Sequence, residues 1–276
     1  MATLLWQDGA SGFFQAGGHR LEYRTVGPEP AVAPTIVLLH EGLGCVSLWR
    51  DFPEALANAT GCGVFLWSRV GYGHSDPAPP PWPLDYMTRE AETCLPLALD
   101  AAGVERCILF GHSDGATIAA IYAGSVSDAR VRGVVLVAPH FFTEPGGLAS
   151  IAKTREGFQS GKLRDALARH HDDVDSLFNG WSGVWLDPEF ARWNVEDALT
   201  YIRVPALAIQ GKEDEYGTLA HVRALEAAAP APVEVVVIEN CRHAPHHERR
   251  PETLGAVSDF VERLLRMERA GAGAAP

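Results

Sequence analysis

Cysteine is scarce in this chain of 276 residues, and no two cysteines form a CxxC pair. Their number is odd, and a chain of this length buries enough apolar surface to fold without disulfides. We therefore expect a reducing compartment and a cytoplasmic location. The five cysteines are Cys45, Cys62, Cys94, Cys107 and Cys241.

The chain also lacks segments that direct proteins into or across membranes. Its first residues, MATLLWQDGASGFF, contain neither a basic stretch nor a long apolar core, so no signal peptide is predicted. No apolar run reaches the length of a membrane-spanning helix. We expect a soluble protein with no membrane partner.

Basic residues are outnumbered, since 23 Lys and Arg against 35 Asp and Glu give a formal net charge of −12. This charge argues against nucleic acid or an anionic membrane as the main partner. With 47% hydrophobic and 21% charged residues, the composition is that of a globular chain. A small-molecule substrate is the expected partner, and a homo-oligomer is compatible with the composition.

Internal repeats are absent, and the apolar residues form short runs of strand length. Within each run, apolar and polar residues do not alternate, and this pattern is typical of strands that are covered on both faces. Helical patterns separate most of them and predict an α/β fold, and Pro96 predicts a kink in one of these helices. A hairpin is expected over residues 12–27. The runs are 35–40, 63–67, 107–111, 133–138, 206–211 and 233–239.

One segment breaks this alternation. Residues 141–201 contain no strand-like run and are rich in tryptophan, aspartate and helix formers. About sixty residues are too many for a connection between two strands, so the segment is predicted to be an inserted helical cap. The expected organisation is a core of residues 1–140 and 202–276 that carries a cap of residues 141–201.

A serine stands where one strand-like run gives way to a helical pattern. Residues 111–115, GHSDG, read G-x-S-x-G, the pattern of a nucleophile elbow around Ser113. Such a turn needs small flanking residues and raises the hydroxyl to a helix N-terminus, where developing negative charge is favoured. A plain glycine-rich turn is the alternative, but the strand before and the helix after favour a nucleophile.

A serine nucleophile needs a base, and the base needs an orienting acid. With this strand order the partners follow as Ser, Asp or Glu, then His, each just after a strand. Asp214 follows the run 206–211, and His243 follows the run 233–239. Four neighbours are alternatives as acid or base, namely Glu213, Glu215, His246 and His247.

Together these segments resemble the α/β-hydrolase fold superfamily along nearly the full chain. LLHEGLG resembles the family's oxyanion loop, SRVGYGHSD its R-G-x-G-x-S segment, GKEDEYG its acid loop and CRHAPHHERRPE its histidine loop. The resemblance implies a mostly parallel eight-stranded sheet with helices on both faces and an inserted cap. It also implies a serine hydrolase with Ser113 as nucleophile, His243 as base and Asp214 as acid, and with no cofactor or metal.

By the same resemblance, the backbone N–H groups of Gly42 and Asp114 form the oxyanion hole, with Leu43 as the alternative to Gly42. Glu41 stands where the family usually has glycine. Its side chain could face the pocket, cap a loop or point to solvent.

Other polar residues near these motifs have plainer explanations. His40 and His112 flank motif residues and are expected to pack or to support the site. The segment 170–175 holds two histidines and three aspartates, but adjacent helical residues face different directions. A solvated cap helix is therefore expected there rather than a metal site.

Asp114 directly follows the candidate nucleophile. In this the chain resembles biphenyl hydrolase-like esterases of the valacyclovir hydrolase type, which implies that Asp114 pairs with a substrate ammonium group. The alternative is a bond within the start of its own helix. Phe141, Trp181 and Trp185 are candidates to line an acyl pocket, or else belong to the core of the cap.

The predicted reaction is hydrolysis of a small carboxylic ester through an acyl-enzyme. The same triad could serve a lactone, an amide or the C–C bond of a ring-cleavage dienoate. Related dehalogenases and epoxide hydrolases use an aspartate nucleophile, which makes them a poorer match. A small-molecule receptor is the non-enzyme alternative, because fold alone does not fix function.

Overall fold

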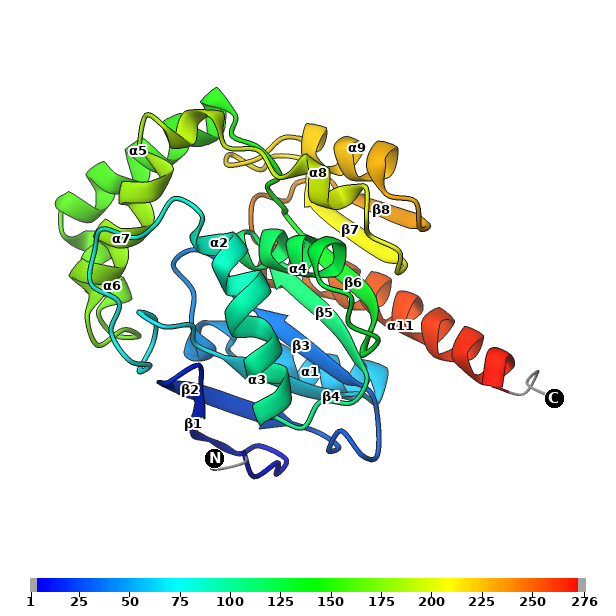
Figure 1. Cartoon of the computed structure of the whole chain (residues 1–276). Coiled ribbons are helices and arrows are strands. Elements are labelled where there is room, and N and C mark those ends of the chain that lie inside the picture. Colours follow the sequence, from blue (N-terminus) through cyan, green and yellow to red (C-terminus); the bar gives the residue numbers. More distant parts are fainter. Residues whose placement is uncertain (1–3, 273–276) are drawn as a thin grey trace.

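An eight-stranded sheet runs through the computed structural model, which describes residues 4–272 (Figure 1). Its strand order is β1-β2-β4-β3-β5-β6-β7-β8. The first two strands form an antiparallel hairpin and β2 pairs antiparallel with β4, whereas all other pairs are parallel. The prediction of a mostly parallel α/β-hydrolase sheet is confirmed. The strands are β1 (Ser11–Ala16), β2 (His19–Val26), β3 (Thr35–Leu39), β4 (Gly63–Trp67), β5 (Cys107–His112), β6 (Val131–Val137), β7 (Ala206–Gly211) and β8 (Val233–Ile238).

The central strands are apolar throughout because each of their two faces meets a separate core. In β3, Ile36 and Leu38 join one hydrophobic cluster, while Val37 and Leu39 join the other. All five residues of β3 are buried. Successive side chains of a strand point to opposite faces, so a sheet covered on both sides needs continuous apolar runs.

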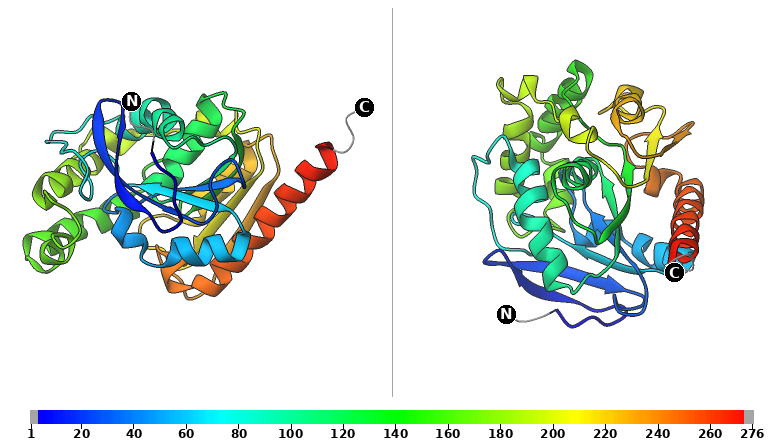
Figure 2. Two further views of the ribbon diagram at one scale, coloured as in Figure 1. Left: turned by 90° about the horizontal axis from the view of Figure 1, so that it is seen from below. Right: turned by 45° about the vertical axis from the view of Figure 1, so that its right-hand side comes forward.

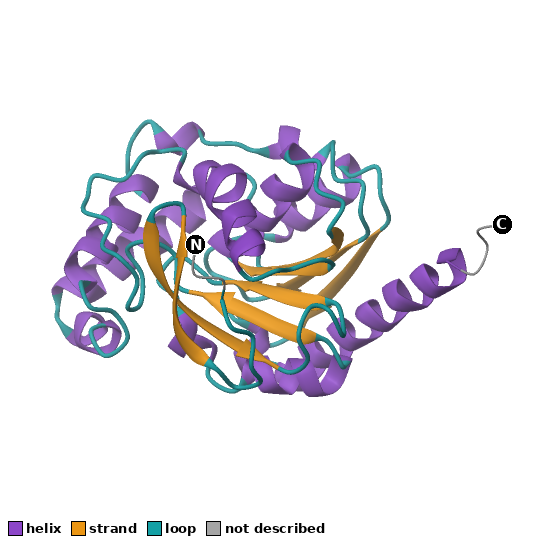
Figure 3. Cartoon of the chain, turned by 60° about the horizontal axis from the view of Figure 1, so that its bottom comes forward, coloured by secondary structure: helices purple, strands orange, loops and turns teal. Residues whose placement is uncertain are grey.

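Helices cover both faces of this sheet (Figure 3). On one face α1 (Phe52–Thr60) lies beside α11 (Arg250–Ala272), as Figure 2 shows. The other face carries α2 (Tyr86–Arg89), α3 (Leu95–Ala101), α4 (Asp114–Ser125) and α9 (Leu219–Ala228), whose apolar side chains enter the second cluster. The short α10 (Pro245–Glu248) precedes α11.

The helical pattern around Pro96 contains a local irregularity. Residues Glu90–Cys94 form a π-helical segment between α2 and α3. Proline lacks an N–H and its ring crowds the preceding turn, so a regular α-helix cannot continue through this position. The sequence predicts a kink at Pro96, and the structure instead has this wider π-helical turn just before it.

The segment between β6 and β7 is helical. It contains α5 (Pro145–Gln159), α6 (Lys162–Leu167), α7 (Val174–Trp185), the short η3 (Phe190–Arg192) and α8 (Glu196–Leu199). The first three gather to one side of the sheet (Figure 1), whereas α8 packs against α4 and α9. The division into a core and a cap of residues 141–201 stays a proposal. Although α8 falls within these residues, it packs on helices of the core.

Candidate active site

Ser113 lies in the tight turn between β5 and α4. Its backbone has φ 54° and ψ −119°, a left-handed conformation that is strained for a residue with a side chain. A Cβ atom added at Gly111 would lie 2.1 Å from the Gly115 carbonyl oxygen, and one added at Gly115 would lie 2.0 Å from the Leu39 carbonyl oxygen. Both glycines of the motif are therefore required by close backbone contacts.

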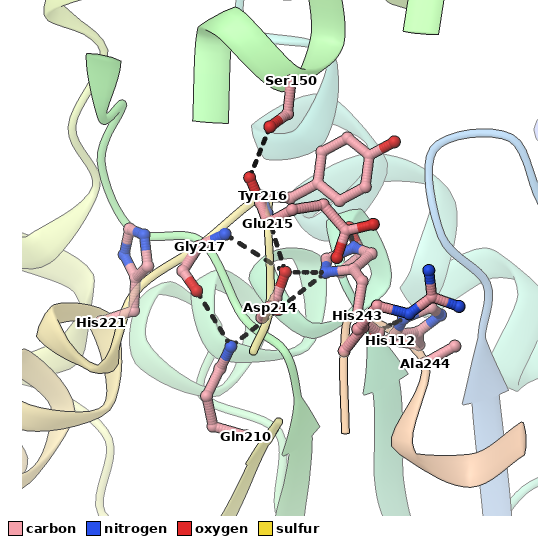
Figure 4. Close-up of polar contacts among 12 residues, drawn as sticks. His112, Ser150, Gln210, Asp214, Glu215, Tyr216, Gly217, His221, His243 and Ala244 are labelled. Carbon is pink, nitrogen blue, oxygen red and sulfur yellow. Dashed lines mark hydrogen bonds and ion pairs between the residues drawn. The ribbon is translucent and has the colours of Figure 1, made fainter. Parts of the chain in front are cut away.

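The structure brings Ser113, His243 and Asp214 together at the carboxyl ends of three strands. The His243 Nε2 atom lies 2.9 Å from the Ser113 Oγ atom. The other ring nitrogen, Nδ1, lies 2.8 Å from Asp214 Oδ2 and 2.9 Å from Oδ1 (Figure 4). This is the order of contacts through which an imidazole can take a proton from a serine hydroxyl.

Asp214 is held in place by three further donors. The Gln210 Nε2 group donates to Oδ2 at 2.7 Å, and the backbone N–H groups of Tyr216 and Gly217 donate to Oδ1 at 2.8 and 3.4 Å (Figure 4). The neighbouring acids are engaged elsewhere, since Glu213 accepts from the Cys241 N–H at 2.7 Å and the Glu215 side chain is exposed. Of the three carboxylates in this loop, Asp214 is the one that contacts His243.

Opposing effects set the protonation of this pair. Burial by itself lowers the pKa of His243, but the charge and hydrogen bond of Asp214 outweigh it and raise the pKa above its ordinary value. Burial raises the pKa of Asp214, but His243 and the Tyr216 N–H outweigh it and lower the pKa. The carboxylate therefore stabilises the imidazolium that forms when His243 accepts a proton.

Three backbone N–H groups are available beside the serine. Within residues 4–272, the N–H groups of Gly42, Leu43 and Asp114 have no hydrogen-bond acceptor. Asp114 is the first residue of α4, and the first N–H groups of a helix have no carbonyl partner within the helix. Trp181 packs so closely on Gly42 that a Cβ atom there would lie 2.0 Å from the indole Nε1 atom. The choice between Gly42 and Leu43 as oxyanion donor stays open.

A cavity of about 240 Å³ opens over these groups. Trp181 and Trp185, which stand four residues apart on α7, form part of its wall. Phe141 does not line the cavity; it is fully buried, and its N–H donates to the His221 ring. The segment after β6 is directed into the core there, so the assignment of Phe141 to the pocket has no support in the structure.

Four lining residues were not predicted, and two of them, His140 and Tyr216, place their rings beside His243. The His140 ring centre lies 5.6 Å from that of His243, and the Tyr216 ring centre lies 4.8 Å from it. His140 stands three residues after Val137, the last residue of β6, and a polar residue in the loop after a parallel strand is the signal that could have identified it. Burial lowers the pKa of His140 well below the ordinary value, so this imidazole is neutral near pH 7.

The Asp114 side chain turns away from its own helix start. It is almost fully buried, lines the cavity and accepts a hydrogen bond from the Tyr86 hydroxyl. That hydroxyl accepts in turn from the Trp185 Nε1 group at 3.1 Å. Burial raises the pKa of Asp114, against the opposing charge of Arg69. Tyr86 is thus part of the site, and no sequence motif marked it.

Glu41 also faces the cavity rather than capping a loop or pointing only to solvent. Its Oε2 atom lies 3.5 Å from His112 Nδ1. His246, an alternative base, is buried against Trp49 and Phe52 and does not contact Ser113. His112 is expected to support the site, and its Nε2 atom lies 2.8 Å from the His243 carbonyl oxygen. This contact agrees with the expected role.

The acidic and histidine-rich segment 170–175 is engaged in ion pairs and in a helix cap, one of the ion pairs being with a residue distant in sequence. Asp172 pairs with His74 at 2.7 Å, Asp175 pairs with Arg164, and Asp173 caps α7 through the Ser176 N–H. Within the described residues, no group of three or more possible ligands is arranged to hold a metal ion. No described helix is long and apolar enough to cross a membrane.

Comparisons with known proteins agree on one fold. The sequence family described as "alpha/beta hydrolase fold" matches residues 34–191. A part of the polyketide synthase ThaQ from Burkholderia thailandensis is 28% identical, in a match that covers 94% of this chain but only 13% of that protein. The chain therefore spans a small part of the length of this curated relative.

Solved structures give the same picture. The enol-lactonase from Burkholderia xenovorans LB400 superimposes with a TM-score of 0.72 at 23% identity, covering 91% of this chain and 100% of that one. Proline iminopeptidase from Mycobacterium smegmatis gives a TM-score of 0.66 at 19% identity, with 92% and 98% covered. At these identities the likeness concerns the fold.

Proposed function

The chain belongs to the α/β-hydrolase fold family, and on that premise we propose that it is a serine hydrolase that cleaves small carboxylic esters. The observation that carries the proposal is the contact of 2.9 Å between Ser113 Oγ and His243 Nε2, with Asp214 on the opposite ring nitrogen. The strained backbone at Ser113 adds support, because such strain is common at functional sites.

In the proposed reaction His243 takes the Ser113 proton while Oγ forms a bond to the ester carbonyl carbon. The carbonyl oxygen becomes an oxyanion that accepts hydrogen bonds from the N–H groups of Gly42, or Leu43, and Asp114. The C–O bond then breaks, and His243 gives its proton to the leaving alcohol. Water attacks the acyl-enzyme with His243 as base, which releases the acid and restores Ser113.

The cavity supports small substrates, since about 240 Å³ is below the usual range for drug-sized ligands. Lactones, amides and C–C bonds remain alternatives for the same triad, because the similar structures include an enol-lactonase and an iminopeptidase. A hydrolase-like receptor is the non-enzyme alternative. The cytoplasmic location and a homo-oligomeric state remain predictions.

The first test is hydrolysis of p-nitrophenyl esters from acetate to long chains by wild type and Ser113→Ala. We expect wild-type turnover with a short-chain optimum and a loss of at least about a thousandfold in the variant. Activity that survives in Ser113→Ala would contradict the nucleophile assignment. Tight ligand binding with no turnover of esters, lactones, amides or C–C substrates would favour the receptor.

A second proposal concerns the charge of the substrate. Asp114 lines the cavity, and none of its described lining residues is a lysine or arginine. Such a cavity favours a substrate that carries an ammonium group and disfavours an anionic acyl group. We propose Asp114 as the partner of that ammonium group, in an aminoacyl ester.

This proposal can be tested with two esters of nearly equal shape, alanine p-nitrophenyl ester and p-nitrophenyl isobutyrate. An ammonium group in one replaces a methyl group in the other. We expect Asp114→Asn, which retains an acceptor for Tyr86, to lower the wild-type preference for the alanine ester by about tenfold or more, since hydrogen bonds to charged groups are the strong ones. An unchanged ratio of kcat/KM values in the variant would exclude this role.

A further inference from the structure

One pair of side chains connects three loops of the proposed site, the oxyanion loop, the elbow and the His243 loop. Glu41 directly precedes Gly42 in the oxyanion loop, and His112 directly precedes Ser113 in the elbow. The Glu41 Oε2 atom lies 3.5 Å from His112 Nδ1. The opposite nitrogen of His112, Nε2, lies 2.8 Å from the backbone carbonyl oxygen of His243.

The surroundings of His112 determine where its protons lie. A carbonyl oxygen only accepts hydrogen bonds, so the His112 Nε2 atom must carry a proton. Among residues 4–272, the buried Nδ1 atom has no hydrogen-bond partner, and it faces the Glu41 carboxylate. Two bare acceptors would repel each other, whereas a second proton between Nδ1 and Glu41 makes the contact an attractive ion pair.

Glu41 is held in this position by its own loop and by Arg69, which follows β4. Its backbone carbonyl accepts from Arg69 Nη2 at 3.2 Å and lies 2.7 Å from His40 Nδ1. The carboxylate lies over Gly44, where a Cβ atom would be 2.4 Å from Oε2. The glycine thus leaves room for the carboxylate to reach toward His112.

A carboxylate at this place would by itself work against the proposed reaction. Glu41 lines the same cavity as Ser113 and is bonded to Gly42, whose N–H is a candidate oxyanion donor. An uncompensated negative charge there would oppose the oxyanion of the tetrahedral intermediate. A proton on His112 Nδ1 would offset this charge without a lysine or arginine in the cavity.

We propose that Glu41 and His112 form a charge-compensated positioning pair that joins the oxyanion loop to the elbow and to the His243 loop. The inference rests on the proposed serine-hydrolase function. In this arrangement Asp214 orients the His243 ring from one side of Ser113. Glu41, through His112, fixes the His243 backbone from the other side.

The ionisation of Glu41 agrees with this geometry. Burial alone raises the pKa of Glu41, but the hydrogen bond and charge of His112, together with the charge of His40, outweigh it and lower the pKa well below the ordinary value. Loss of the His112 partner should therefore leave burial dominant and raise the Glu41 pKa.

The test is a double-mutant cycle of Glu41→Gln and His112→Gln, assayed on the best p-nitrophenyl ester. We expect Glu41→Gln to lose about threefold or less in kcat, because an amide can still contact a neutral His112. His112→Gln leaves the carboxylate unpaired and should lower kcat by about 10- to 100-fold with little change in KM. Adding Glu41→Gln to His112→Gln should recover about tenfold of that loss.

His246→Gln provides a matched control, because the His246 ring packs 4.6 Å from that of His112, centre to centre, without forming this pair. Glu41→Gln should recover nothing in the His246→Gln background. The proposal is overturned if the double variant is no faster than His112→Gln, or if His112→Gln equals wild type.

Titration of Glu41 by carboxyl ¹³C NMR separates this inference from the proposed function. In wild type we expect Glu41 to titrate well below ordinary glutamates, and in folded His112→Gln to titrate higher than in wild type. An ordinary pKa in the wild-type protein would exclude the pair, even if no variant folds. A lack of ester turnover by wild type would instead refute the proposed function, and the titration would still decide whether the pair exists.

Discussion

At the scale of single residues, the site depends on which of two effects prevails at each buried ionisable group. At His243 the charge of Asp214 prevails over burial, so its pKa lies above the ordinary value of 6.5. At His140 and His246, which contact no carboxylate, burial prevails and lowers the pKa. One of these three imidazoles is thereby prepared to accept a proton, and the other two stay neutral.

This difference predicts the pH dependence of activity. His243 must be neutral to accept the Ser113 proton, so kcat/KM should fall as pH decreases through the raised pKa, with its acid limb centred above pH 6.5. Asp214→Asn removes the charge and leaves burial, which lowers the pKa. We expect the limb to move to lower pH and kcat at neutral pH to drop by roughly 10³- to 10⁴-fold.

The measurement is kcat/KM for the best ester between pH 5 and 9 in both proteins, with Glu213→Gln as the matched control in the same loop. The control should keep the wild-type limb, since Glu213 binds the Cys241 N–H instead of His243. A limb at the same pH in wild type and Asp214→Asn would refute the coupling of the two residues.

Site residues that follow strands could be predicted from the sequence. Site residues that reach the site only through the packing of helices could not. Ser113, Asp214 and His243 each stand just after a strand, so their convergence follows from the parallel sheet. Tyr86 reaches Asp114 from α2, a contact that depends on how two helices pack. Nothing in the local sequence around Tyr86 specifies that packing.

At the scale of elements, the strands were predictable because burial on both faces leaves a continuous apolar pattern. The helices of the inserted segment were predictable in kind, but their partners were not. Trp181 and Trp185 face the cavity, while Trp193 stacks on Phe190 with ring centres 5.0 Å apart. All three are tryptophans of the same segment, and only the fold of that segment separates their roles.

The helix around Pro96 shows the same limit. The chemistry of proline predicts that the helical hydrogen bonding is disturbed, and it does not say how the backbone adjusts. In the structure the adjustment is the π-helical segment Glu90–Cys94, which allows the chain to continue into α3. The location of the disturbance was thus predictable, and its form depended on the packing of α2 and of the π-helical segment itself against α4.

At the scale of the whole molecule, the proposed catalytic residues and the apolar clusters that stabilise the fold lie in different places. The proposed catalytic side chains lie at the carboxyl ends of β5, β7 and β8, while two large apolar clusters hold the sheet between its helix layers. The alternation of strand-like and helical patterns in the sequence predicts this arrangement. The loops could not be placed from sequence, because their contacts form only after both layers have packed.

This separation predicts that a core substitution far from the site lowers stability without altering the chemistry. Phe260 on α11 is 2% exposed and belongs to the cluster on the face opposite α4. Phe260→Ala should cost about 3–5 kcal/mol of unfolding free energy, which lowers Tm by about 5–10 °C. Met267→Ala, 57% exposed on the same helix, is the control and should change Tm little. Thermal unfolding and ester kinetics well below Tm test the two parts of this prediction. An unchanged Tm in Phe260→Ala would contradict the stabilising role of this core, and a kcat that falls while the protein stays folded would show that the core and the site are coupled.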